Sequence, residues 1–130
     1  MLDHVSIGVS DLARSIALYD AVFAPLGYVR LWSDRDAAGY GRPGCDDGFA
    51  IKHDSSREVR SSYRSHVAFA TDDPLLVERF YRAAIAHGCA DDGPPGLCPE
   101  YGAGYFAAFV RDPDGYRIEA VCHLPAGESL

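Results

Sequence analysis

Polar and apolar residues alternate in several short stretches of the chain, and two helical patterns lie between them. The alternation predicts six half-buried strands, at residues 4–9, 28–32, 49–53, 66–71, 105–110 and 116–121. Apolar residues recur at helical spacing from Leu12 to Leu26 and again from Leu76 to Ala84. Each half of the chain therefore contains a strand, a helix and then two or three strands, which predicts an α+β fold.

Capping and turn residues mark the ends of these elements. Asp11 precedes the first helical pattern and Asp73-Pro74 precedes the second, so both aspartates are predicted to be helix N-caps. The segment 112–115, Asp-Pro-Asp-Gly, predicts a tight turn between the last two strands. Glycine and proline are frequent at 33–48, where we expect turns and a short strand, and at 91–104, which is predicted to be a long loop.

The two halves share a sequence pattern at a shift of 62 residues. Six identities carry it: His4/His66, Val5/Val67, Asp11/Asp73, Tyr19/Tyr81, Ala21/Ala83 and Ala24/Ala86. Ordinary composition would give about two identities over such a window. We therefore divide a single domain, residues 1–130, into module one at about 1–54, a polar linker at about 55–64 and module two at about 65–124.

Composition limits the class of protein. The chain has 130 residues, of which 48% are apolar, and a formal net charge of −7. An acidic chain without a basic stripe argues against nucleic acid and anionic membranes as partners, and no apolar run is long enough to span a membrane. The four cysteines form no C-x-x-C pair and no signal peptide is visible, so we expect reduced thiols and a cytoplasmic protein.

His4 and His66 open the two equivalent strands, and they are the first candidates for chemistry. On both strands the histidine side carries only serine, glycine or alanine, while bulky apolar residues occupy the opposite side. The helices should pack on the bulky side, so the histidines are expected to face open space. For one such histidine a structural role would be favoured, but a repeated pair favours a metal site or catalysis.

Glu119 is the candidate for a third ligand. Two histidines and one carboxylate form a common metal site with open positions for substrate. Glu119 lies within an apolar strand, where an unpaired charge is costly. An ion pair with Arg117, on the same face, is the alternative. Zinc, nickel, manganese and ferrous iron all accept this set of ligands, and spacing does not choose among them.

The chain resembles the vicinal oxygen chelate superfamily, the group of glyoxalases, bleomycin resistance proteins and extradiol dioxygenases. The matching segments are 2–12 with the helix around Tyr19, His66-Val67-Ala68-Phe69, and 112–119, which together reach over nearly the whole chain. The resemblance implies two tandem βαβββ modules that form a cupped mixed sheet, with helices on the outer face. It also implies one divalent metal ion, held by His4, His66 and Glu119.

The sequence departs from the family pattern at two places. The second ligand of glyoxalase I, a glutamate or glutamine, falls on Ala50, which cannot bind a metal, and Lys52 on the same face would oppose a cation. A three-ligand site remains, as in extradiol dioxygenases and fosfomycin-type thiol transferases. A His-Tyr-His pattern of small bacterial members is replaced by residues 100–102, Glu-Tyr-Gly. Glu100 is thus a candidate base or ligand, and an exposed loop carboxylate is the alternative.

Together these features predict a divalent-metal-dependent enzyme that acts on a small molecule with two adjacent oxygens. A glyoxalase-like lyase is the nearest class. The alternatives are a ring-cleaving dioxygenase and a non-catalytic drug-binding protein of the bleomycin-resistance type. His4, His66 and Glu119 are the predicted metal ligands, and Glu119 and Glu100 the predicted catalytic residues. By analogy we expect a homodimer, with a site formed within one chain or drawn from two.

Overall fold

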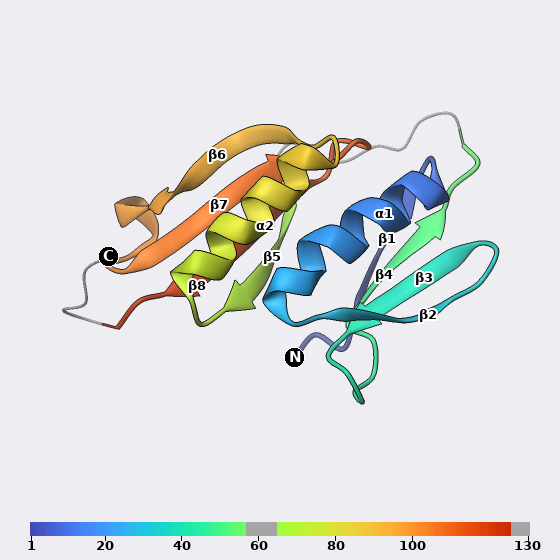
Figure 1. The fold of residues 1–130 in the computed structure, drawn as a ribbon, viewed down its shortest axis with the longest axis horizontal. Helices are drawn as coiled ribbons and strands as arrows, with labels where there is room; N and C mark the ends of the chain where they lie inside the picture. Colours follow the sequence, from blue (N-terminus) through green and yellow to red (C-terminus); the bar gives the residue numbers. More distant parts are fainter. Residues whose placement is uncertain (57–64, 126–130) are drawn as a thin grey trace.

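The computed structural model describes residues 1–56 and 65–125, and it contains two modules of the same design (Figure 1). Module one consists of β1 (Val5–Val9), α1 (Leu12–Phe23), the short 3₁₀ helix η1 (Ala24–Leu26), β2 (Val29–Ser33), β3 (Ala37–Gly41) and β4 (Phe49–His53). Module two consists of β5 (His66–Thr71), α2 (Pro74–Ala86), β6 (Ala90–Leu97), the 3₁₀ helix η2 (Pro99–Tyr101), β7 (Tyr105–Arg111) and β8 (Arg117–His123). Most of the predicted linker lies outside the described residues.

Each module builds its own four-stranded mixed sheet, in the orders β1-β4-β3-β2 and β5-β8-β7-β6. The first strand of each module is parallel to the last, and the other pairs are antiparallel. Ser6 pairs with Ala50 in module one, and Ala68, which is 62 residues after Ser6, pairs with Glu119 in module two. The predicted α+β fold with two βαβββ modules is confirmed, and Ala50 occupies the position that corresponds to Glu119.

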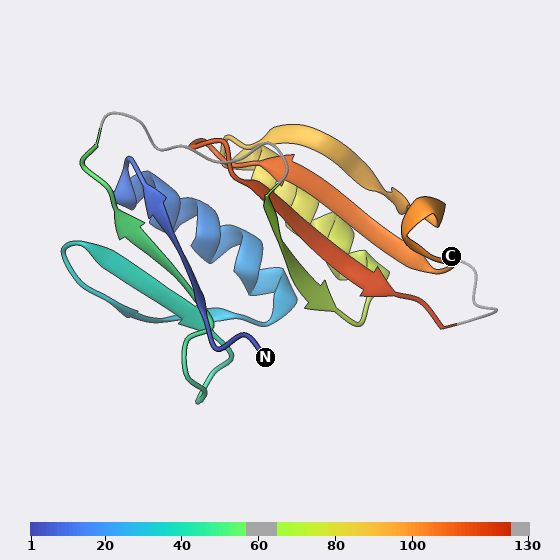
Figure 2. The ribbon, with the colours of Figure 1, turned by 180° about the vertical axis from the view of Figure 1, so that it is seen from behind.

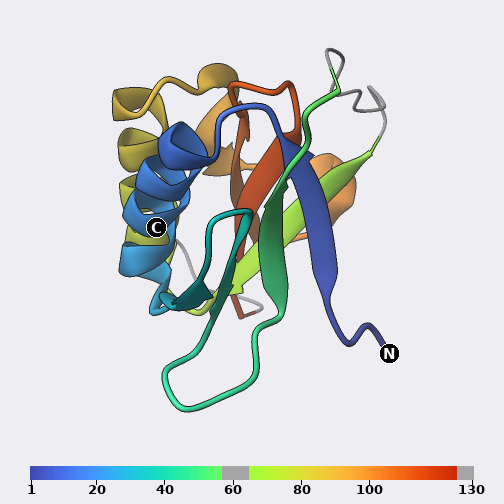
Figure 3. The ribbon, with the colours of Figure 1, turned by 90° about the vertical axis from the view of Figure 1, so that its right-hand side faces the viewer.

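The two helices form one layer and the strands form another (Figure 3). Helices α1 and α2 lie side by side on one side of the molecule (Figure 1), while the view from behind shows the sheets with no helix in front of them (Figure 2). The hydrophobic core between the layers is continuous across the modules. The ring of Phe69 packs edge-on against Phe23 and Phe49, at centroid distances of 4.8 Å and 5.3 Å.

The predicted helix caps are confirmed. The Asp11 carboxylate accepts a hydrogen bond from the backbone N–H of Arg14, and the Asp73 carboxylate accepts one from the backbone N–H of Leu75. Each bond satisfies one of the backbone donors that a helix start leaves unpaired. The helical pattern that runs to Leu26 ends at Gly27, whose positive φ of 83° suits glycine.

Strand β6 corrects the prediction of a long loop over residues 91–104. The segment pairs with β7 in spite of its two glycines and two prolines, with register shifts on either side of Gly93. It is the edge strand of its sheet. Proline has no backbone N–H to donate, and an edge strand tolerates this because only one of its sides pairs with a neighbouring strand. Gly93 has a φ of 148°, and a Cβ there would lie 3.0 Å from the ring of Phe109, so the bulge requires glycine.

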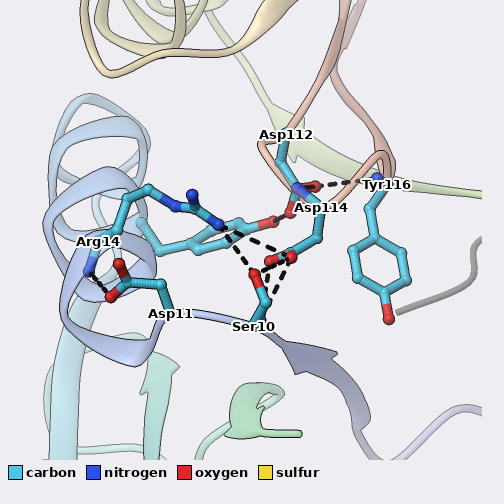
Figure 4. A network of polar contacts seen from close by, with 7 residues as sticks. Ser10, Asp11, Arg14, Asp112, Asp114 and Tyr116 are labelled. Carbon is cyan, nitrogen blue, oxygen red and sulfur yellow. Dashed lines mark hydrogen bonds and ion pairs between the residues drawn. The ribbon is translucent and has the colours of Figure 1, made fainter. Parts of the chain in front are cut away.

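A polar network joins the end of β1 to the turn between β7 and β8 (Figure 4). The Ser10 hydroxyl donates to the Asp114 carboxylate at 2.6 Å, and the backbone N–H of Ser10 donates to the same group at 3.2 Å. The Arg14 guanidinium lies 3.7 Å from it, and the Asp114 side chain is only 4% exposed. The predicted turn therefore also ties module two to module one.

Asp112, in the same turn, forms the buried part of this connection. Its carboxylate accepts hydrogen bonds from the Tyr19 hydroxyl at 2.7 Å and from the backbone N–H groups of Asp114 and Tyr116, at 3.0 Å and 2.9 Å. Burial raises the pKa of the Asp112 carboxyl, and burial followed by the neighbouring Asp112 charge raises that of the Tyr19 hydroxyl. The turn thus holds helix α1 against module two through the buried hydrogen bond from Tyr19 to Asp112.

All four cysteines are free in the structure. In the part of the chain that the structure describes, no helix has the length and apolar character needed to cross a membrane.

Candidate functional site

His66 and Glu119 meet on the uncovered face of module two. His66 is the first residue of β5, and Glu119 lies in the middle of the adjacent strand β8. The imidazole Nε2 is 3.2 Å from Glu119 Oε1, and the Glu119 side chain is only 1% exposed. As predicted from the faces of the strand, His66 and its small neighbours Ala68 and Ala70 are exposed, while Val67 and Phe69 are partly buried.

The orientation of these two side chains suits a common cation. Glu119 Oε1 is buried and accepts no hydrogen bond from any described residue, and its one polar contact among them is the ion pair that a protonated His66 would form with it. A buried carboxylate oxygen without a partner is costly. Two atoms bound at about 2.1 Å to one metal ion stand roughly 3.0–3.4 Å apart, which matches the observed contact. His66 and Glu119 therefore fit the role of metal ligands.

Tyr105 holds the other oxygen of Glu119. Its hydroxyl, from the first residue of β7, donates a hydrogen bond to Glu119 Oε2. Burial, followed by this bond to a carboxylate, raises the pKa of the Tyr105 hydroxyl, so the phenol keeps its proton and remains a donor. The rings of Tyr101 and His123 pack against Tyr105 at centroid distances of 5.3 Å and 5.1 Å. Aromatic side chains thus form one wall beside Glu119.

Arg117 does not pair with Glu119, which was the alternative explanation for a charge in this strand. Its guanidinium Nε lies 2.8 Å from Asp92 Oδ2, and its Cζ lies 4.2 Å from the centre of the Phe109 ring. The Arg111 Nε is 3.3 Å from the same Asp92 oxygen. Both arginines are therefore directed to Asp92, and among residues 1–56 and 65–125 the Glu119 carboxylate has polar contacts with His66 and Tyr105.

His4 lies on the uncovered face of module one, directly before β1. Its Nδ1 is 2.7 Å from Asp3 Oδ1. A carboxylate only accepts hydrogen bonds, so Nδ1 is the donor in this contact and Nε2 is the ring nitrogen directed away from Asp3. This arrangement, in which a carboxylate fixes one ring nitrogen and the other stays free, is typical of histidines that bind metals.

The cavity beside His4 has a volume of about 460 Å³ and mixed polarity. Its walls include Trp32, Asp47, Ala50 and Lys52. Ala50 and Lys52 lie on the face predicted for them, so the uncovered face of module one has no carboxylate at position 50.

One chain does not bring His4 together with His66 and Glu119. Strands β1 and β5 run in opposite directions in Figures 1 and 2, and both histidines stand at the starting ends of these strands. The starts of β1 and β5, where the two histidines lie, are consequently on opposite sides of the molecule, across its long axis. Within residues 1–56 and 65–125, no group of three or more histidine, cysteine, aspartate or glutamate side chains is arranged to hold a metal ion.

Glu100 lies on η2 and is exposed to solvent. Among the described residues, the polar contacts of the Glu119 carboxylate are with Tyr105 and His66 and do not include Glu100. Its charge acts on Cys98, where burial raises the pKa of the thiol and the carboxylates of Glu100 and Glu119 raise it further. Glu100 therefore stands at the rim of this face rather than beside the His66–Glu119 pair.

The sequence alone did not reveal the partners of the candidate ligands. Tyr105 was predicted only as the first residue of a strand, and no role was predicted for Asp3 or Asp47. One signal for Tyr105 was present, since residues 105 and 119 share a face of the predicted hairpin once the register of the turn is known. For Asp47 no such signal existed, because its place depends on how residues 42–48 fold back onto the sheet.

Comparison with known proteins gives one consistent family. The model of the Glyoxalase/Bleomycin resistance protein/Dioxygenase superfamily matches residues 1–120. A glyoxalase/bleomycin resistance protein from Albidiferax ferrireducens T118 is similar in structure, with a TM-score of 0.79, 29% identity, and coverage of 95% of this chain and 98% of that one. No curated protein matches the sequence.

Two more distant structures share the fold alone. The fosfomycin resistance protein FosX from Mesorhizobium loti has a TM-score of 0.69 at 19% identity, over 95% of this chain and 92% of that one. A glyoxalase/bleomycin resistance protein/dioxygenase family enzyme from Burkholderia phytofirmans PsJN has a TM-score of 0.71 at 18% identity, over 95% and 98%.

Proposed function

Because the chain belongs to the Glyoxalase/Bleomycin resistance protein/Dioxygenase superfamily, we propose that it is a divalent-metal-dependent enzyme acting on a small molecule with two adjacent oxygens. A glyoxalase-like lyase is the nearest class. We further propose that two copies of the chain share each metal site, with His66 and Glu119 from one copy and His4 from the other. The observation that carries the proposal is the buried Glu119 Oε1, which has no hydrogen bond among the described residues and lies 3.2 Å from His66 Nε2.

The opposite placement of the histidines supports a site built from two chains. In a dimer with a twofold axis, the uncovered face of module one of each copy would contact the uncovered face of module two of the other copy. Each of these faces exposes a large aromatic side chain, Trp32 at 39% beside His4 and Tyr101 at 56% beside Tyr105. Contact between two copies would cover both.

The side chains around such a metal site would have different roles. When bound, a divalent metal would polarise the oxygens of the substrate as a Lewis acid. Glu119 supplies a buried negative charge, Tyr105 fixes its carboxylate, and Asp3 fixes the ring of His4. Glu100, at the rim, is the candidate general base that would take a proton from the substrate.

A drug-binding protein without catalysis is the second candidate, and the cavity of module one favours it. Asp3, Asp46 and Asp47 line this cavity together with Trp32, and Lys52 is its one basic lining residue among those described. Carboxylates and an indole suit a cationic ligand. This candidate predicts tight binding of such a ligand by protein that holds no metal.

Metal analysis of tag-free protein tests the proposal. We expect about one divalent ion per chain in the wild type and loss of that ion in His66→Ala and Glu119→Gln. Glu100→Gln should retain the ion and lose turnover. A metal content that His66→Ala leaves unchanged would contradict the proposed site. Wild-type protein without metal affinity that binds a cationic drug would favour the second candidate.

A further inference from the structure

Because Gly39 has no side chain, the side chains of Trp32 and Asp47 can lie directly against strand β3 at this position. A Cβ at this position would lie 2.1 Å from the indole Nε1 of Trp32 and 2.9 Å from the carboxylate Oδ2 of Asp47. Both distances are shorter than any real Cβ contact. The Trp32 ring and the Asp47 carboxylate therefore occupy the space that a side chain on β3 would fill.

This space lies next to the position of the missing ligand. Gly39 pairs with Ala50 across β3 and β4. Directly paired residues on one face have Cβ atoms about 4.5–5.5 Å apart. The Asp47 carboxylate consequently lies close to the position that the carboxylate of a glutamate at residue 50 would occupy, at a distance of about one side-chain length.

His4 stands at the same end of the sheet. The backbone N–H of Val5 donates to the carbonyl of Gly48 at 3.0 Å, so the residue before Val5 and the residue before Gly48 are close neighbours in the fold. His4, Asp47 and Ala50 all line the cavity of about 460 Å³. Lys52, the residue that would oppose a cation, lies two positions further along β4, about 7 Å from Ala50.

The Asp47 carboxylate is available for a ligand. Among the described residues no hydrogen bond or ion pair engages it. In the shared site, it would be a second carboxylate beside Glu119 of the other copy, whose Oε1 is buried without a hydrogen bond among the described residues. Asp46, its neighbour in the chain, lines the same cavity but is more exposed, and the contact at Gly39 involves Asp47 alone.

We propose that Asp47 supplies the metal-binding carboxylate that Ala50 cannot provide. The inference rests on the proposed function and completes its site, with His4 and Asp47 from one copy and His66 and Glu119 from the other. Two imidazoles and two carboxylates form a ligand set that zinc, nickel, manganese and ferrous iron accept. The paired negative charges also balance a divalent cation.

The test is the metal affinity of three variants in the full-length protein. Chelator-stripped protein is titrated calorimetrically with Zn²⁺ and, separately, with Mn²⁺. Asp47→Asn should weaken binding at least as much as the roughly 10–100-fold loss caused by removing a partner of a metal ligand. Asp46→Asn, the matched control, should bind as the wild type does. In Asp47→Asn, the added change Ala50→Glu should restore affinity by returning a carboxylate to β4.

The outcomes separate this inference from the proposed function. If His66→Ala loses the metal while Asp47→Asn binds it normally, the metal site stands and the role of Asp47 is wrong. An equal loss in Asp46→Asn and Asp47→Asn would also overturn it, because that result indicates general charge rather than ligation. If the wild type binds neither ion, the proposed function fails and the inference fails with it. Circular dichroism of each variant confirms that it is folded.

Discussion

Glu119 is the residue on which the site depends most. The sequence indicated it as an ionised side chain within an apolar strand, and its repeat equivalent, Ala50, shows that the strand does not need a carboxylate for its fold. Its two immediate partners, His66 and Tyr105, come from different strands. A sequence pattern gives the face of a residue but not the direction of its side chain, so the bond from Tyr105 could not be predicted.

Tyr105→Phe tests whether this bond positions the carboxylate for a metal. Without the hydroxyl, Glu119 loses the donor that fixes Oε2, and we expect the affinity for Zn²⁺ to fall by about 10–100-fold in a calorimetric titration. Tyr101→Phe is the matched control, because this ring packs on Tyr105 without a hydrogen bond to Glu119 among the described residues. Equal affinities for Tyr105→Phe and wild type would show that the bond has no positioning role.

Asp112 gives a pH-dependent contribution to stability. Burial raises its folded pKa above the ordinary value of 3.8, so the folded chain holds the proton more tightly than the unfolded chain does. Ionisation therefore costs stability: the cost is absent below 3.8 and complete once the pH exceeds the folded pKa. Relative to Asp112→Asn, the free energy of unfolding of the wild type should fall as the pH rises through this window.

Urea denaturation of both proteins between about pH 3 and pH 7 measures this difference. A difference that is constant with pH, or that grows as the pH rises, would show that the charged form of Asp112 is not penalised in the fold.

At the scale of elements, the sequence was sufficient to predict the strands with clear polar–apolar alternation and the helices with capping residues. The remaining strands form because they pair with other strands, and the local sequence does not show that pairing. Strand β6 is the clearest example. Its two glycines and two prolines are typical of a loop, but pairing with β7 and bulges around Gly93 make it a strand. Strand β3, within the segment 33–48, was expected only as a short strand among turns. Local composition cannot reveal a partner that is far away in the sequence.

The turn between β7 and β8 was predicted, but its role between the modules was not. Ser10→Ala removes the hydroxyl that donates to the buried Asp114 carboxylate. We expect the free energy of unfolding to decrease by about 1.5–3 kcal/mol, as for other hydrogen bonds to a charged group. Urea denaturation measures the change. Asp72→Asn, an exposed substitution, serves as control and should stay within about 0.5 kcal/mol of the wild type.

At the scale of the whole molecule, the duplication was visible in the sequence, and the relative orientation of the modules was not. That orientation follows from the packing of Phe69 on Phe23 and from the connection of Ser10 to Asp114. It places the starts of β1 and β5, where His4 and His66 lie, on opposite sides of the molecule. The sequence left open whether one chain or two form the site, and this placement is the reason that we propose two.

Complementation between two variants tests the shared site most directly. His4→Ala and His66→Ala should each fail to bind metal. After the two variants are mixed, dissociated and reassociated, half of the dimers should be mixed, and each mixed dimer should contain one intact site, made from the unaltered histidine of each chain. Metal binding should then return to about a quarter of the wild-type level. Recovery to that level is the result that we predict, and no recovery in verified mixed dimers would contradict a site shared between two copies.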